Sequence, residues 1–331
     1  ADGSVFVWNP LDWHFVESKR IVTDGSITSI STNSDGGLIV ADAGSGPTLW
    51  RRSGNGHLAT YGNDADVGMS TVSRDGRWVA TAGDGPEITL RDLGTRAGTT
   101  RTLGGSDGWI TALRFAPDGR YLASATDSGD IRLWPTDAKS TKSSISLIGT
   151  YDLVRALAFD QHGRMLASGG RDGAIRLWDL QTAKELDFGL KGQNVHDISI
   201  LPDGNRLVAT GADGDVIVWN LSIEHPLGEV WYSHSNEAQI YGLAISADGR
   251  WLASGDESGL VRIKAGRAGL AERQPWKALP KAVRSVAFSS DARFLAAAGD
   301  GGHVRVFDMV ENRVLQVAET GRSADVLKVA F

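Results

Sequence analysis

The stretch RMLASGGRDGAIRLWDL (Arg164–Leu180) has two near-copies elsewhere in this chain. The upstream copy reads RYLASATDSGDIRLWPT (Arg120–Thr136), and the downstream copy reads NRLVATGADGDVIVWNL (Asn205–Leu221). Each copy contains two short segments rich in Leu, Ile, Val and Ala, separated by a turn of Gly and Asp, which is typical of antiparallel β-strands. Because an internal repeat decides the architecture of a chain, its period is the first quantity to establish.

The repeat has a period of about 43 residues. Each unit has one apolar strand before a turn of the Asp-Gly type and another after it. A second Gly/Asp turn leads to a third strand, a fourth and less regular strand follows, and no stretch sustains a helical period. Leucine-rich repeats and parallel β-helices have shorter units, so these units predict an all-β propeller of four-stranded antiparallel blades. The seven turns of the first kind begin at Asp35, Asp75, Asp118, His162, Asp203, Asp248 and Asp291.

The composition fits such a fold and narrows the function. Glycine is abundant, at 41 of 331 residues, and proline is scarce, at 9, which indicates tight turns and not a low-complexity linker. The net charge of −6 argues against nucleic acid as the main ligand. The absence of cysteine excludes disulfides and thiolate metal sites and favours a reducing compartment, so we expect a cytoplasmic protein. No apolar run approaches a membrane span, and no signal-peptide pattern occurs at Ala1.

The strand count favours eight blades over seven, in a single propeller domain over residues 1–331. Seven complete units lie within residues 27–319. Residues 1–22 supply a third and a fourth strand, and residues 326–331 supply a first strand, of an incomplete closing blade without a second strand. We therefore expect the sequence to be a piece of a longer chain. A seven-bladed ring with leftover strands is the alternative, although dangling apolar strands disfavour it.

These units resemble the WD-repeat family over essentially the whole chain. The Trp-Asp signature stands in LWD (Leu177–Asp179), and close variants end at Trp50, Trp134 and Trp219. The chain departs from the family pattern because the Gly-His pair before the first strand is missing from nearly every unit. The tryptophan is also replaced in three units, by Arg91, Lys264 and Phe307. We therefore expect the family's buried network of His, Asp, Ser and Trp to be incomplete, and stability to rest on apolar packing between blades.

The sequence contains no convincing catalytic or metal-binding motif. It lacks His-Glu-x-x-His, Gly-x-Ser-x-Gly and a phosphate-binding loop. The glycine-rich stretch Ser53–Gly62 joins two strands and opens no helix, so we interpret it as a hairpin. Of the histidines, only His225 and His234 lie close in sequence, and a metal pair there is the minor interpretation. We expect no enzyme activity, no cofactor and no metal.

Departures from the repeat are more informative than its consensus, because symmetry alone explains residues that recur. The polar insertion Thr136–Ser146 predicts a mobile loop, with phosphorylation or partner docking as the alternative. The segment Ser222–Gln239 places Trp231, Tyr232 and His234 together, either for core packing or as an exposed aromatic contact.

A third departure is a basic stretch, Arg262–Arg284, whose one acidic residue is Glu272. It is either an outer strand whose charges block edge pairing or a patch that binds an acidic partner. The residues of such a patch are Arg262, Lys264, Arg267, Arg273, Lys277 and Lys281.

One position in the innermost strand of each unit should face the mouth of the central channel. It follows the first apolar residue of the strand, and its identity varies strongly between units, although a core strand has no structural need for that variation. The family resemblance implies that such positions bind partners, and a rigid frame loses little entropy on binding. The alternative explanation is that these residues face solvent and vary because nothing constrains their identity. The predicted partner-binding residues are Thr28, Thr111, Arg155, His196, Tyr241, Arg284 and Leu327, with Gly68 at the same position of the second unit.

These features predict a non-catalytic scaffold that recognises a protein or peptide, with no nucleic acid partner. Regular repeats without cysteine resemble bacterial WD-repeat arrays, which commonly follow a kinase, a STAND-type nucleotidase or a caspase-like protease. The resemblance implies a sensor or autoinhibitory role in signalling beside such a linked domain. The alternative is a propeller enzyme, or a propeller that binds a small ligand, with its site over the channel; His196 is the channel-mouth residue that favours it.

Overall fold

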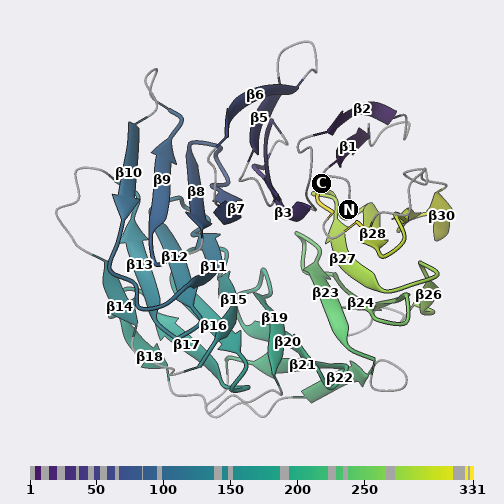
Figure 1. Cartoon of the computed structure of the whole chain (residues 1–331). Coiled ribbons are helices and arrows are strands. Elements are labelled where there is room, and N and C mark those ends of the chain that lie inside the picture. The colour runs from purple at the N-terminus through teal and green to yellow at the C-terminus, as the bar shows by residue number, and fades with distance from the viewer. Residues whose placement is uncertain are drawn as a thin grey trace.

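A computed structural model describes most of the chain: residues 4–8, 15–20, 27–34, 37–43, 48–52, 58–63, 67–83, 85–94, 99–137, 144–147, 152–186, 194–222, 229–233, 238–265, 273–315, 325–326 and 329–331. Within these ranges the strands form seven four-stranded antiparallel sheets and one two-stranded sheet. No helix in the described part of the chain could cross a membrane. Figure 1 shows the sheets arranged around a central axis, with the first strand of each sheet nearest to that axis. The predicted all-β propeller fold is confirmed.

We number the four-stranded sheets as blades 1 to 7 in chain order, and each is given from its inner to its outer strand. Blade 1 consists of β3 (Ile27–Thr32), β4 (Leu38–Ala43), β5 (Thr48–Arg52) and β6 (Leu58–Asn63). Blade 2 consists of β7 (Val67–Val72), β8 (Trp78–Gly83), β9 (Ile88–Asp92) and β10 (Thr99–Leu103). Blade 3 consists of β11 (Ile110–Phe115), β12 (Tyr121–Thr126), β13 (Ile131–Pro135) and β14 (Ile145–Leu147). Blade 4 consists of β15 (Val154–Phe159), β16 (Met165–Gly170), β17 (Ile175–Asp179) and β18 (Lys184–Leu186).

The remaining blades follow the same order. Blade 5 consists of β19 (Val195–Ile200), β20 (Arg206–Gly211), β21 (Asp215–Asn220) and β22 (Glu229–Ser233). Blade 6 consists of β23 (Ile240–Ile245), β24 (Trp251–Asp256), β25 (Leu260–Ala265) and β26 (Trp276–Lys277). Blade 7 consists of β27 (Val283–Phe288), β28 (Phe294–Gly299), β29 (Val304–Asp308) and β30 (Arg313–Leu315). The two-stranded sheet pairs β1 (Ser4–Trp8) with β2 (Phe15–Arg20).

Consecutive blades pack through apolar side chains. The inner strand β15 lies against β11 and β19, and β23 lies against β27. One core cluster combines Ile175 and Leu177 of blade 4 with Val195 and Ile198 of blade 5. Because each blade covers the apolar face of its neighbour, no blade can bury its core alone.

The turn between the first and second strands shows why the repeat carries Asp-Gly. In blade 2 the Asp75 carboxylate accepts the backbone N–H of Arg77 at 3.0 Å and the hydroxyl of Ser73 at 2.5 Å. Gly76 sits at φ +71°, a conformation that is unfavourable for residues with a Cβ. Blade 7 has the same turn around Asp291, but Ala292 occupies the glycine position at φ +58°.

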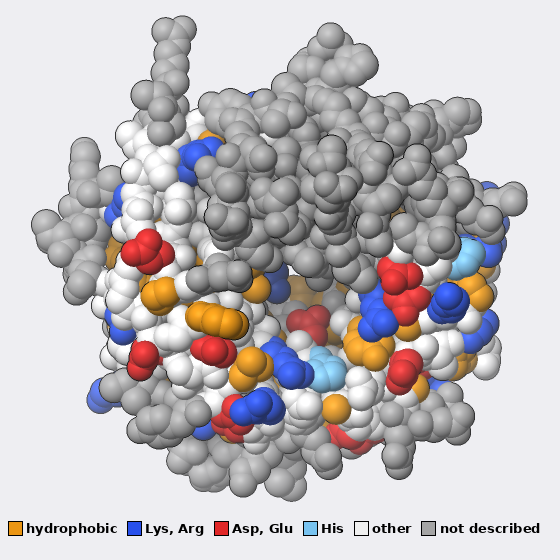
Figure 2. Space-filling view, viewed as in Figure 1, with side chains coloured by type: hydrophobic (Ala, Val, Ile, Leu, Met, Phe, Trp, Pro, Cys, Tyr) orange, Lys and Arg blue, Asp and Glu red, His pale blue; other side chains and the backbone are white. Residues whose placement is uncertain are grey.

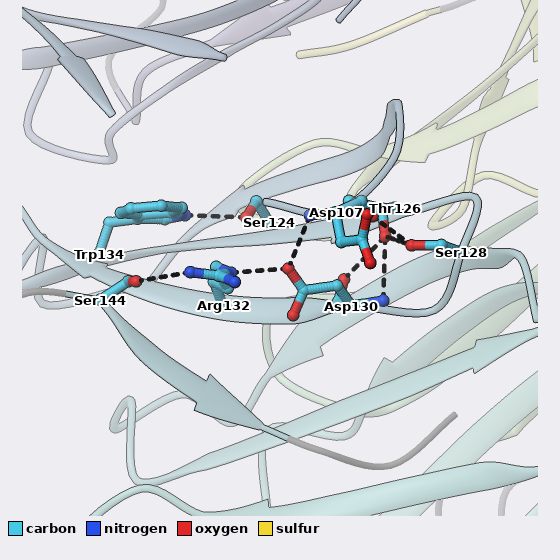
Figure 3. Close-up of polar contacts among 8 residues, drawn as sticks. All are labelled: Asp107, Ser124, Thr126, Ser128, Asp130, Arg132, Trp134 and Ser144. Carbon is cyan, nitrogen blue, oxygen red and sulfur yellow. Dashed lines mark hydrogen bonds and ion pairs between the residues drawn. The ribbon is translucent and has the colours of Figure 1, made fainter. Parts of the chain in front are cut away.

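The described tryptophan side chains of the third strands are packing residues. Trp178 is 1% exposed and Trp219 is 2% exposed. In blade 3 the indole N–H of Trp134 donates to the Ser124 hydroxyl at 2.8 Å (Figure 3). Ala209 stands at the position of Ser124 in blade 5, so Trp219 has no such hydroxyl to bond. The polar network therefore differs from blade to blade, whereas apolar burial recurs.

The C-terminal segment lies between blades 7 and 1. Val326 and Val329 pack against the apolar cluster of β28 and β29. The first strand of blade 5 packs on blade 4 in the same way. The backbone N–H of Val329 donates to the Ser285 hydroxyl at 3.2 Å, and the Thr32 hydroxyl donates to the carbonyl of Phe331 at 3.3 Å. This position is the one expected for the first strand of an eighth unit. The count of eight blades stays a prediction.

Candidate functional site

Each predicted channel-mouth residue of blades 1 to 7 lies at a β-bulge in the inner strand of its blade. In blade 4, Val154 pairs with Gly170 and Ala156 pairs with Gly169, so Arg155 is inserted between two consecutive pairs. A bulge bends its strand and redirects the side chain of the extra residue. The same shift occurs at the same strand position in all seven blades, at Thr28, Gly68, Thr111, Arg155, His196, Tyr241 and Arg284.

From blade 3 to blade 5, the bulge residues contact the neighbouring blade through hydrogen bonds. The Thr111 hydroxyl donates to the carbonyl of Val154 at 2.6 Å. Arg155 is exposed, and its guanidinium donates to the Asn194 amide oxygen at 3.2 Å. His196 Nδ1 lies 3.4 Å from the carbonyl of Ile240, which accepts its hydrogen bond. Each of these three side chains thus contacts the blade that follows its own.

In blades 6 and 7, an aromatic ring and an ion pair lie together. The Arg284 guanidinium lies 4.5 Å from the centre of the Tyr241 ring. It also forms two hydrogen bonds with the Asp300 carboxylate, at 2.7 and 2.8 Å. These bonds raise the pKa of the Arg284 guanidinium above its ordinary value, while burial acts in the opposite direction. Arg284 therefore stays charged, and the Asp300 carboxylate balances that charge.

We call Thr111, Arg155, His196, Tyr241 and Arg284 the bulge arc. Figure 2 shows basic, acidic and histidine side chains around the hollow at the centre of this face. Leu327 lies outside the described residues, and at Thr28 and Gly68 only the backbone is described. The structure therefore brings together five of the predicted positions.

Another ion pair lies beside the arc in blade 4. Arg171 and Asp152 approach to 2.8 Å, and this contact holds the pKa of the Asp152 carboxyl below its usual range. Arg155 adds a weaker favourable charge interaction with the same carboxyl. The described part of the chain contains no group of three or more His, Cys, Asp or Glu side chains that could hold a metal ion.

The basic stretch contains residues with different environments. The Arg273 guanidinium lies 4.8 Å from the centre of the Trp251 ring and donates to Asn312 at 2.6 Å and to the Met309 carbonyl at 2.5 Å. Burial lowers the pKa of Arg273. Lys277 donates to the carbonyl of Ser258.

Of the remaining basic residues, Arg262 and Lys264 are half-buried in β25, Lys281 is exposed, and Arg267 lies outside the described residues. Arg273 thus fastens blade 6 to blade 7. A patch for an acidic partner stays a prediction.

Two other predicted features fall on residues that the structure does not describe in full. Within the Thr136–Ser146 insertion, residues 138–143 lie outside the described part. In Ser222–Gln239 the backbone of β22 is described, but the side chains of Trp231 and Tyr232 are not, and His225 and His234 lie outside the described part. These interpretations stay untested.

The sequence reasoning missed Trp109, which is 64% exposed beside the bulge arc. Its position directly precedes the first apolar residue of the inner strand, where the later units carry Leu153, Asn194, Gln239 and Ala282. Because these residues are partly polar and partly apolar, the repeat does not require an apolar side chain at this position. The tryptophan there was therefore the signal that could have identified Trp109.

The WD domain, G-beta repeat family model matches residues 98–135, 142–179, 185–220, 226–263 and 276–308, more than half of the chain. WD repeat-containing protein SL1-17 of Schistosoma mansoni is 35% identical over 119 residues, which cover 36% of this chain and 38% of that protein. Meiotic recombination protein rec14 of Schizosaccharomyces pombe is 33% identical, covering 34% of this chain and 35% of that protein. Small ribosomal subunit protein RACK1 of Candida albicans is 31% identical, covering 34% of this chain and 36% of that protein. The chain thus spans little more than a third of the length of each of these relatives.

The sequence repeats, the four-stranded blades and the matches to the family model agree. The chain belongs to the WD-repeat family.

Proposed function

We propose that this propeller is a non-catalytic scaffold that binds a protein or peptide on the face formed by the bulge arc. WD-repeat domains commonly bind proteins, and members of the family are generally non-catalytic scaffolds. The single observation that carries the proposal is that residues at one bulge position differ in charge and shape from blade to blade. The strands that bear them keep the same register.

The chemistry of the arc supports recognition of a polypeptide. Tyr and Arg dominate many protein interfaces because each combines apolar area with directional hydrogen bonds. Arg155 is exposed, its guanidinium bonds to a neutral amide, and its interaction with the Asp152 carboxyl is weak, so it can still pair with a partner carboxylate. The inner strands fix the arc before binding, which reduces the entropy that association costs.

A display selection of random peptides against the propeller tests this proposal even though the partner is unidentified. Tyr241→Ala and Arg155→Ala should weaken the selected peptides by about 1–4 kcal/mol while the variants fold normally. Arg164→Ala is the matched control, because Arg164 is exposed on the turn at the other end of β15. Peptides that bind the arc variants as tightly as the wild type would contradict the proposed face.

The wider role belongs to the same proposal. We infer, from the regularity of its repeats and its lack of cysteine, that the propeller is the sensor or regulatory module of a cytoplasmic bacterial signalling protein. Isolation of the gene with its flanking sequence tests this role. A neighbouring kinase, nucleotidase or protease domain supports it, and the absence of any signalling domain from the complete gene product removes it.

A further inference from the structure

Trp109 exposes most of its indole on the face that carries the bulge arc. It is 64% exposed, although it lies directly before the buried Ile110 of β11. An exposed tryptophan costs solubility, and tryptophan is the residue type most enriched among those that dominate protein interfaces. Its position two residues before Thr111 makes it an extension of the arc in blade 3.

The backbone that carries this indole is fixed. Asp127 holds Trp109 from both sides, because its carboxylate accepts the Trp109 N–H at 2.7 Å and its own N–H donates to the Trp109 carbonyl at 3.0 Å. The preceding loop is held as well: the Asp107 N–H donates to the Asp130 carboxylate at 3.2 Å, and the Asp107 backbone carbonyl accepts the Ser128 hydroxyl (Figure 3). An aromatic ring on such a frame loses little backbone entropy when a partner covers it.

Two acidic residues accompany Trp109: Asp107 precedes it by two positions, and Asp127 bonds to its backbone. Asp107 and Asp127 are exposed, and neither carboxylate forms an ion pair with any residue that the structure describes. The nearby Arg132 offers no compensation, because its guanidinium pairs with Asp130 at 2.6 Å (Figure 3). In the next blade the bulge arc carries an exposed cation, Arg155.

We propose that Trp109, Asp107 and Asp127 form a subsite for an arginine side chain of the bound protein partner. A guanidinium can stack on the face of an indole and gain from two flanking carboxylates at the same time. The subsite rests on the proposed function and adds to it the chemistry of the partner: its segment over blade 3 is basic.

Titration with the peptide Gly-Arg-Gly-Arg-Gly, followed by NMR of the indole N–H signals, tests the subsite. The Trp109 signal is identified by its loss in Trp109→Phe, and the buried Trp178 serves as an internal reference. The Trp109 signal should shift saturably with this peptide and stay in place with Gly-Glu-Gly-Glu-Gly. In the double variant Asp107→Asn with Asp127→Asn the apparent affinity should fall at least about threefold. The amide oxygen of the new asparagine side chain can still accept the Trp109 N–H, so the loop keeps its geometry.

Glu87→Gln is the matched control, because it removes an exposed carboxylate from blade 2 and should leave the affinity unchanged. A Trp109 signal that ignores the arginine peptide, or that shifts equally in the double variant, overturns the subsite. The display selection against the arc uses other variants and other peptides. If the titration fails while arc-dependent peptides are found, the subsite is wrong and the proposed function stands. If no selected peptide depends on the arc, the proposed function fails whatever the titration shows.

Discussion

At the scale of single residues, the tryptophans show how the fold distributes its apolar area. Trp178 is buried between blades 3 and 4, in a cluster with Leu133, Val154 and Leu166. The Trp109 side chain has the same chemistry and is largely exposed. Trp178 lies within β17 and is covered by the neighbouring blade, whereas Trp109 lies just before β11, so the same residue type stabilises the core at one place and is available to a partner at the other.

Trp178→Ala should lower the free energy of unfolding by about 3–5 kcal/mol, because it removes a fully buried aromatic side chain and leaves a cavity. Trp109→Ala should change it by less than about 0.5 kcal/mol, as expected of an exposed side chain. Urea denaturation of both variants measures the difference. A loss in Trp109→Ala that equals the loss in Trp178→Ala would contradict the assigned burial.

Ala292→Gly should stabilise the protein by about 0.5–1 kcal/mol. Ala292 adopts φ +58° at a turn position where blades 2 to 6 carry glycine with a positive φ, and relief of the left-handed strain outweighs the entropy that glycine adds to the unfolded chain. Gly204→Ala is the reverse experiment, because its φ is +71° and a Cβ there meets no atom within 4 Å. It should cost about 1 kcal/mol. Thermal denaturation of both variants checks the opposite signs.

At the scale of elements, the joints between blades combine apolar packing with a few directional contacts. The outer strand β26 places Trp276 against Phe307 of blade 7, with ring centres 4.0 Å apart. Arg273, just before β26, reaches Met309 and Asn312 of the same neighbour. A basic residue that the sequence offers for a partner therefore holds two blades together.

Arg273→Ala should lower the free energy of unfolding by about 1–2 kcal/mol, because it removes the contact with the Trp251 ring and two hydrogen bonds across the joint. Lys281→Ala, an exposed lysine of the same basic stretch, should leave stability within about 0.5 kcal/mol. Chemical denaturation compares the two. Equal, negligible effects would show that Arg273 is a free surface charge.

At the scale of the whole molecule, the C-terminal segment links blade 7 to blade 1. Val329 packs on β28 and β29, whereas its neighbour Ala330 is exposed. A propeller closes by packing the faces of its blades on one another, so contacts at this junction contribute to the stability of the ring.

Val329→Asp should lower the free energy of unfolding by about 1–3 kcal/mol, because it places a charge in an apolar contact between distant parts of the chain. Ala330→Asp adds the same charge one residue later, on the exposed side, and should have little effect. Differential scanning calorimetry of the two variants measures the contrast. If Val329→Asp melts with the wild type, the segment does not stabilise the ring.

The sequence by itself determined the fold, because Asp-Gly turns and apolar strands repeat with a period that only four-stranded blades satisfy. It also located the bulge arc, since Arg155, His196 and Tyr241 vary within an otherwise faithful repeat. The tertiary structure alone decided which charges are free. Asp300 neutralises Arg284, and Met309 and Asn312 engage Arg273, from partners 16, 36 and 39 residues away. Such pairs depend on how strands and blades are placed side by side, and no local pattern in the sequence records that placement.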